Sequence, residues 1–152
     1  MSNKIAVIGV GKLGICFALN LEKAGFEVWG VEKHLSYLNK LKDGSFLSSE
    51  PQVNELLAKA KRLNFSDDIS VIKENDIKDI FIMVATPSNP SGEYDHSQIE
   101  RVVENLKTIG NPEVIRHIYL GCTTMPGYTL ELGKRMEKFG YTVSYNPEFI
   151  AQ

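Results

Sequence analysis

Hydrophobic and polar positions follow two different periods along this chain. Runs of consecutive β-branched and apolar residues predict strands buried on both faces, and segments with an apolar residue every three or four positions predict amphipathic helices. The expected strands are 5–8, 27–31, 63–65, 77–84, 115–120 and 142–145. The expected helices are 12–23, 35–41, 51–61, 69–74, 95–106 and 128–139.

Strand and helix therefore alternate along the whole chain. Because parallel strands are joined by right-handed crossovers through helices, this alternation predicts an α/β fold, a Rossmann-type doubly wound parallel sheet with six strands in the order 3-2-1-4-5-6. With 152 residues, 43% of them hydrophobic, the chain is long enough for a substantial core. We expect a single domain over residues 1–152.

A glycine-rich turn follows the first expected strand and opens the first helix. Gly9 permits the tight turn, Gly11 lets the backbone come close to a pyrophosphate, and Gly14 lets the helix pack closely on the strand. Free N–H groups at the helix start, at Lys12 and Leu13, would bind the phosphates, since the helix dipole favours an anion there. This pattern predicts a dinucleotide site; the alternative is a flavodoxin-like sheet whose glycines only form a turn.

Glu32 directly follows the second expected strand, about twenty residues after the glycines. A carboxylate at this point can accept hydrogen bonds from both hydroxyls of an adenosine ribose, and it repels the additional phosphate of NADP. We therefore predict NAD as the cofactor. The basic residues Lys33 and His34, which follow directly, leave NADP open as the alternative.

Composition narrows the classes of partner. The formal net charge of −2 gives no basic surface for nucleic acid or for an anionic membrane. No apolar run reaches the roughly 20 residues of a membrane span, and the first residues lack the layout of a signal peptide. The two cysteines, Cys16 and Cys122, suggest neither a disulfide framework nor a metal site. A cytoplasmic location is the simplest interpretation.

Three polar clusters follow later strands. They are Thr86-Pro87, Cys122-Thr123-Thr124 and Asn146-Pro147-Glu148-Phe149. Because the carboxyl ends of parallel strands meet at one rim, these clusters should converge with the glycine turn, where ligands of such sheets bind. Thr86 either bonds the cofactor ribose or simply terminates its strand.

At this point the residues resemble a known family, the UDP-glucose/GDP-mannose (nucleotide-sugar) dehydrogenases, and specifically their N-terminal NAD-binding domain. The likeness covers nearly the whole chain and rests on these segments: 5–14, Glu50-Pro51 with 55–57, 84–87 with Gly92 and Asp95, 122–127, and 146–149.

The resemblance implies an activity and roles for single residues. Family members oxidise the C6 alcohol of a nucleotide sugar to a carboxylate with two NAD molecules. Thr123 matches the family threonine that holds a water near the reacting carbon, and Glu148 matches the acid at the general-base end of the site. Glu32 matches the ribose-binding acid, and Thr86, followed by Pro87, matches the strand-end threonine beside the cofactor.

The chain departs from the family pattern at several positions. Ala85 replaces a proline, Cys122 replaces a serine, and Gln152 stands where many members have a second glutamate, so base catalysis there is in doubt. Thr124 adjoins Thr123, and a shift of one residue would exchange their roles. The family's nucleophilic cysteine, its substrate domain and the long connecting helix through which its homodimers form lie beyond Gln152.

We accordingly expect this chain to bind NAD, to meet its nucleotide sugar through the missing half, and to turn over little alone. The alternatives are the NAD-binding domain of a 6-phosphogluconate-type or hydroxyacyl-CoA-type dehydrogenase, and a non-enzymatic NAD-sensing module. A reactive thiol at Cys122 is a further alternative, whereas Cys16 reads as a small helix residue. His34 and His96 are expected to be solvated, and His117 to be structural.

Overall fold

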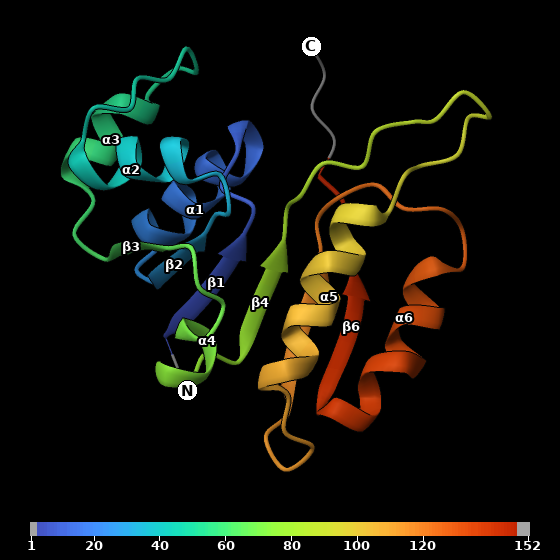
Figure 1. Cartoon of the computed structure of the whole chain (residues 1–152). Coiled ribbons are helices and arrows are strands. Elements are labelled where there is room, and N and C mark those ends of the chain that lie inside the picture. The colour runs from blue at the N-terminus through green and yellow to red at the C-terminus, as the bar shows by residue number, and fades with distance from the viewer. Residues whose placement is uncertain (1–2, 149–152) are drawn as a thin grey trace.

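A parallel six-stranded sheet forms the centre of the molecule, with the strand order β3-β2-β1-β4-β5-β6 (Figure 1). The structure is a computed structural model, and it describes residues 3–148. The strands are β1 (Lys4–Ile8), β2 (Glu27–Val31), β3 (Leu63–Ser66), β4 (Asp79–Ile82), β5 (Arg116–Leu120) and β6 (Tyr141–Tyr145). The predicted fold class and strand order are confirmed.

Helices connect successive strands. They are α1 (Lys12–Lys23), α2 (Leu35–Asp43), α3 (Val53–Lys59), α4 (Val71–Glu74), α5 (Ser97–Ile109) and α6 (Tyr128–Met136), with a 3-10 turn, η1, at Glu137–Phe139. In Figure 1, α5 and α6 lie in front of the half of the sheet that contains β4 and β6, and α1, α2 and α3 lie beside the other half.

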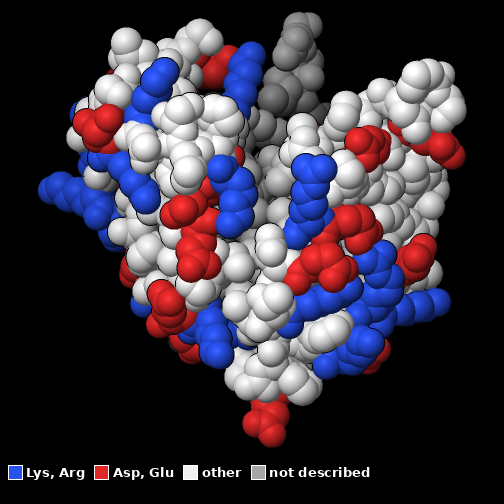
Figure 2. Space-filling view, viewed as in Figure 1, with Lys and Arg blue, Asp and Glu red and all other residues white. Residues whose placement is uncertain are grey.

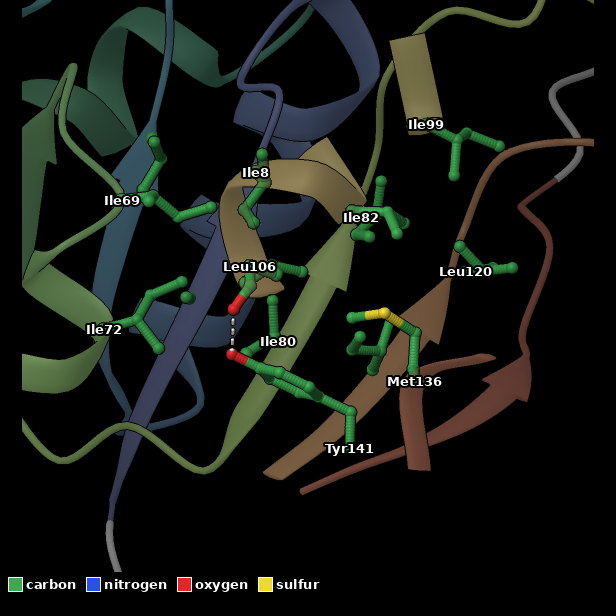
Figure 3. Close-up of a cluster of buried hydrophobic side chains, with 14 of the residues drawn as sticks. Ile8, Ile69, Ile72, Ile80, Ile82, Ile99, Leu106, Leu120, Met136 and Tyr141 are labelled. Carbon is green, nitrogen blue, oxygen red and sulfur yellow. Dashed lines mark hydrogen bonds between the residues drawn. The ribbon is translucent and has the colours of Figure 1, made fainter. Parts of the chain in front are cut away.

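Two hydrophobic clusters cover the two faces of the sheet. Successive side chains of a strand point to opposite faces, and in β1 Ile5 and Val7 enter one cluster while Ala6 and Ile8 enter the other. The first cluster contains the buried face of α1. The second contains buried side chains of α4, α5 and α6 (Figure 3), and Tyr141 closes it by donating a hydrogen bond to the Leu106 carbonyl at 2.8 Å. Trp29 of β2 packs against this second cluster.

Most element boundaries differ from the sequence prediction by a few residues, and two of these differences have a clear cause in the structure. The third helix starts at Val53 rather than at Pro51, because Gln52 has a left-handed backbone (φ 67°) that a right-handed helix cannot contain. The fourth strand spans only Asp79–Ile82, since the Ile77 amide closes the turn of α4 by donating to Ile72 O at 2.9 Å. Both corrections concern the ends of single elements, and the strand order of the sheet is unaffected.

Candidate functional site

The turn after β1 is shaped by close contacts that only glycine allows. Gly9 has a φ of 88°, and its N–H donates to Val31 O at 2.9 Å. A Cβ at Gly9 would lie 2.9 Å from Met83 O, and one at Gly14 would lie 1.9 Å from Gly9 O. These glycines therefore bring the start of α1 against the ends of β1 and β4.

The start of α1 has an open approach. Gly11 is its N-cap residue and supplies no side-chain cap, so the first amides of the helix, which include those of Lys12 and Leu13, have no acceptor from the N-cap side chain. A Cβ at Gly11 would meet no atom within 4 Å, in contrast to Gly9 and Gly14. Lys12 Nζ lies 3.0 Å from Glu50 Oε1, so the ammonium group beside this helix start is paired with a carboxylate. Such an end suits a diphosphate.

A cavity of about 180 Å³ adjoins the turn. Gly9 and Glu32 both line it, and the Glu32 carboxylate accepts a hydrogen bond from the His34 N–H at 3.0 Å. The remaining lining comes from Ile8, Val31, Lys33, Ile69, Val84, Gln98, Arg101, Val102 and Asn105. Figure 2 shows this face hollowed between the two halves of the molecule, with basic side chains on either side of the hollow. An apolar floor with polar and charged walls is typical of a nucleoside pocket.

The segment after β4 leaves the sheet at the same rim. Pro87 O accepts a hydrogen bond from the Asp95 N–H at 2.8 Å, which ties the two ends of the loop 88–94 together. The Asp95 carboxylate in turn accepts a hydrogen bond from the N–H of Ser97, the first residue of α5, at 2.8 Å. Thr86 is half-buried at this exit and does not line the cavity.

The two last predicted clusters lie against each other. The Asn146 N–H donates to Leu120 O at 2.9 Å and the Glu148 N–H donates to Gly121 O at 3.1 Å. These bonds bring the Asn-Pro-Glu segment beside the turn that carries Thr123, as expected from strands that end at one rim. Thr123 is half-buried and Glu148 is exposed. Phe149 and Gln152 lie outside the described residues.

Neither cysteine has the surroundings of a reactive thiol. Cys122 is buried, and the loss of hydration raises the pKa of its thiol to about 11, so it is protonated near neutral pH. Cys16 donates to Lys12 O at 3.2 Å, and burial raises its pKa as well. The structure thus favours the interpretation of both as packing residues. No group of three or more potential metal ligands occurs among residues 3–148.

Two side chains that bear on the site were missed by sequence reasoning. Tyr37 of α2 donates to Val10 O in the glycine turn at 2.8 Å. His96 accepts a hydrogen bond from the Met125 N–H at 3.2 Å, so the prediction that it is solvated is wrong. The available signal was that 83–96 and 121–127 follow neighbouring strands, which places a histidine of one beside the other.

The other two histidines have structural contacts. His34 is exposed as predicted, yet its Nδ1 accepts the Tyr37 N–H at 3.3 Å and caps α2. His117 Nε2 lies 2.8 Å from Ser144 Oγ, between β5 and β6, which agrees with the structural role expected of it. No helix within the described part of the chain is long and apolar enough to span a membrane.

The residues present fit a dinucleotide. The open glycine and the uncapped start of α1 suit a diphosphate, and the adjoining cavity, with a carboxylate in its wall, suits the nucleoside half of the ligand. Thr123 and Glu148 lie at the ends of β5 and β6 and do not line this cavity. The predicted site residues thus fall in two regions of one rim of the sheet, one beside the glycine turn and one after β5 and β6.

Comparisons with known proteins agree with this description. The model of the UDP-glucose/GDP-mannose dehydrogenase family, NAD binding domain, matches residues 3–152. UDP-glucose 6-dehydrogenase TuaD of Bacillus subtilis (strain 168) is 30% identical over 159 residues, which cover 98% of this chain and 33% of that protein. Uncharacterized protein MJ1054 of Methanocaldococcus jannaschii is 29% identical over 97% of this chain and 16% of its own length.

Solved structures give the same result. GDP-mannose dehydrogenase of Pseudomonas aeruginosa, in a ternary complex, superposes with a TM-score of 0.84 at 26% identity, covering 100% of this chain and 37% of that one. A UDP-glucose dehydrogenase from Pyrobaculum islandicum gives 0.79 at 27% identity over 98% of this chain and 36% of that one. The chain therefore spans about a third of the length of most of these relatives.

Proposed function

Because the chain belongs to the UDP-glucose/GDP-mannose dehydrogenase family, as its NAD-binding domain, we propose that it is the cofactor-binding part of a nucleotide-sugar 6-dehydrogenase. NAD is the cofactor of this domain. The relatives named UDP-glucose and GDP-mannose dehydrogenases support a nucleotide sugar as the substrate of the longer protein. The domain assignment also favours this function over that of a 6-phosphogluconate-type or hydroxyacyl-CoA-type dehydrogenase.

The glycine turn and Glu32 would hold the adenosine and diphosphate parts of NAD. The amides at Lys12 and Leu13 would donate to the diphosphate, which the backbone reaches because Gly11 has no side chain. The Glu32 carboxylate, in the wall of the cavity, would accept hydrogen bonds from the ribose hydroxyls. Thr86 and Pro87, at the exit of β4, would flank the other half of the dinucleotide.

The ends of β5 and β6 would serve the reaction itself. Bound NAD supplies a hydride acceptor. Thr123, on the turn after β5, would hold a water near the reacting carbon, with Thr124 as the alternative donor. The Glu148 carboxylate is exposed at the same rim, where it can accept a proton from a substrate hydroxyl or a water.

The complete reaction needs groups outside this chain. The family resemblance implies a nucleophilic cysteine and a sugar-nucleotide site in the later part of a longer, dimeric protein, and neither cysteine here has a lowered pKa. We therefore expect the chain alone to bind NAD without measurable oxidation of UDP-glucose or GDP-mannose. Steady production of NADH by the purified chain would contradict this part of the proposal.

The observation that carries the proposal is the uncapped helix start at Gly11, open to solvent and adjacent to the cavity that Glu32 lines. Its test is a calorimetric titration of the chain with NAD and NADP. NAD should bind saturably and more tightly than NADP. Failure of NAD to bind, or tighter binding of NADP, would refute the proposal.

A pair of matched glycine variants makes this test specific. Gly11→Ala adds a methyl group that meets no protein atom, so the fold should be retained while NAD affinity falls about 10-fold or more, since the methyl occupies the diphosphate's approach. Gly133→Ala makes the same change in α6, where the nearest atom, Val143 Cβ, is 4.0 Å away. NAD affinity should be unchanged in this control.

A further inference from the structure

The turn after β5, residues 121–127, carries Thr123 and has few attachments to the rest of the chain. At its start the Gly121 N–H donates to Ile82 O at 3.0 Å, and at its end the Tyr128 N–H donates to Met125 O at 3.2 Å. The Gly121 carbonyl accepts from the Glu148 N–H at 3.1 Å and the Gly127 carbonyl from the Glu131 N–H at 3.1 Å, so the main-chain bonds lie at the two ends of the turn. In its middle, within the described part of the chain, the Met125 N–H makes a hydrogen bond. Its acceptor is a side chain, His96 Nε2, 3.2 Å away.

The chemistry of this bond fixes the state of the histidine. An amide N–H can donate only to a ring nitrogen that carries a lone pair, so Nε2 must be unprotonated and the ring proton must lie on Nδ1. The bond joins the segment before α5 to the turn before α6, which are 29 residues apart in sequence. It therefore links the exits of β4 and β5, two neighbouring strands.

The imidazole ring of His96 is held in place by packing. Its centroid lies 4.0 Å from that of the Tyr128 ring, with 38° between the planes. Tyr128 is itself fixed, since its hydroxyl donates to Glu100 Oε1 at 2.6 Å, and Arg135 donates to both oxygens of the same carboxylate. Burial and the Glu100 carboxylate raise the pKa of Tyr128, which keeps this hydroxyl a donor.

We propose that His96 is a positioning residue for the cofactor site: by accepting the Met125 N–H it holds the Thr123 turn where the nicotinamide end of NAD binds. This inference rests on the proposed function. The adenosine end is built separately, by the glycine turn and Glu32, and neither His96 nor Met125 lines its cavity. Loss of the bond should therefore weaken binding of the whole dinucleotide more than binding of its ADP-ribose part.

Two variants separate the hydrogen bond from the ring packing. His96→Phe retains an aromatic ring against Tyr128 but cannot accept a hydrogen bond, whereas His96→Gln retains an acceptor near the position of Nε2 but has no ring. Calorimetric titrations with NADH and with ADP-ribose are made on the wild type and on both variants. Thermal unfolding followed by circular dichroism confirms that each variant is folded.

The expected result is a difference between the two ligands. His96→Phe should weaken NADH binding about 3- to 10-fold, as expected for one lost hydrogen bond, and change ADP-ribose binding by less than about twofold. His96→Gln should remain within about twofold of the wild type for both ligands. An unchanged ratio of the two affinities in His96→Phe, or equal losses in both variants, would overturn the proposal.

Hydrogen exchange of the Met125 amide provides a readout that is independent of the ligand. In the wild type this amide should exchange more slowly than its neighbours in the turn, and in His96→Phe the protection should be lost. An unprotected Met125 amide in the wild type would refute the clamp, by which we mean the hydrogen bond from the Met125 N–H to His96, even if the variant failed to fold. If the wild type bound neither ligand while Met125 was protected, the proposed function would fail and the clamp alone would stand.

Discussion

The two halves of the sheet contribute to the site in different ways. In the half formed by β1, β2 and β3, the turn at the rim is made by the main chain, because side chains at Gly9 and Gly14 would collide with carbonyl oxygens. In the half formed by β4, β5 and β6, the turn that carries Thr123 is tied down by a side chain, His96. The first turn is determined mainly by close main-chain contacts at its glycines, and the second depends in its middle on a side chain 29 residues away.

This difference predicts how each half responds to mutation. In a turn built from close main-chain contacts, an added methyl group either fits or displaces the backbone, so a substitution has either little effect or a large one. A turn held by side-chain hydrogen bonds loses about 1 kcal/mol for each neutral bond that is removed, and the rest of the fold persists. The variants below test that contrast in order of decreasing effect.

Gly14→Ala should have the largest effect on stability. Its Cβ would lie 1.9 Å from Gly9 O, so α1 must move away from β1, at a cost of about 3 kcal/mol. For a chain of this length the thermal midpoint should fall by roughly 10 °C, as measured by circular dichroism. Gly133→Ala, the control, should be neutral or slightly stabilising. A midpoint for Gly14→Ala close to that of the wild type would break the comparison.

Glu100→Gln should cost less, because it weakens rather than blocks the contacts between α5 and α6. The carboxylate accepts from Arg135 and from Tyr128, and its side chain is 35% exposed, so the expected loss at pH 7 is about 1 kcal/mol in urea unfolding. Glu104→Gln is the matched control, since that carboxylate is 63% exposed beside Lys107 and should contribute little.

The same variant predicts a dependence on pH. The hydrogen bonds from Arg135 and Tyr128 lower the pKa of Glu100 in the folded chain below its ordinary value of 4.5. A lowered pKa contributes stability that is present above about 4.5 and is lost as the pH falls through the folded-state pKa. The stability difference between the wild type and Glu100→Gln should therefore shrink between pH 5 and pH 3. A constant difference would show that the charge is not involved.

Tyr37→Phe should have a similar or smaller effect in the other half. It removes the hydroxyl that donates to Val10 O, so unfolding in urea should become easier by about 1 kcal/mol or less, and the glycine turn should keep its conformation. Burial raises the pKa of Tyr37 to about 12, so this cost should not vary between pH 6 and pH 9. Tyr145→Phe, at a side chain 44% exposed, is the control. A loss above about 2 kcal/mol would mean that this turn, too, needs a side-chain clamp.

Lys12→Met should have the smallest effect. The ion pair with Glu50 joins side chains that are 61% and 31% exposed, and such pairs contribute less than about 1 kcal/mol. We expect a loss below about 0.5 kcal/mol in urea unfolding that disappears in 1 M salt, because salt screens exposed charges. Lys59→Met, which breaks the more exposed pair with Glu55, provides the comparison. A larger loss that persists in salt would contradict a main-chain origin for this turn.

The part of the site that the sequence predicts best is the part that is local in the chain. The strand, the glycine turn, the helix from Lys12 to Lys23 and the following strand to Val31 have the predicted order and nearly the predicted bounds. Gly9, Gly14 and Gly30 each lie where an added Cβ would collide with a residue of the same unit or of an adjacent strand or its exit. At Gly9 and Gly14 an added Cβ would lie within 3 Å of a carbonyl oxygen, so the spacing of these two glycines already contains the geometry of the turn.

What the sequence could not predict depends on contacts between distant residues. The bond between His96 and Met125 spans 29 positions, and nothing in the residues around His96 distinguishes a buttressed ring from a solvated one. The left-handed conformation of Gln52 could not be predicted either, since glutamine has no preference for it and Pro51 fits the first turn of a helix. Side-chain partners follow from the fold, and the fold must be known first.

Trp29 is the only tryptophan of the chain, and it lies in β2, the strand that leads to Glu32. Its indole N–H donates to the Glu27 carboxylate at 3.2 Å, and its ring packs against the α5 side of the sheet. Indole emission overlaps the absorption band of a reduced nicotinamide. When NADH binds at the rim, energy transfer to it should therefore lower the fluorescence intensity of Trp29. The fluorescence of Trp29 should thus report the fraction of the chain that has NADH bound, without a label and without the catalytic part of the longer protein.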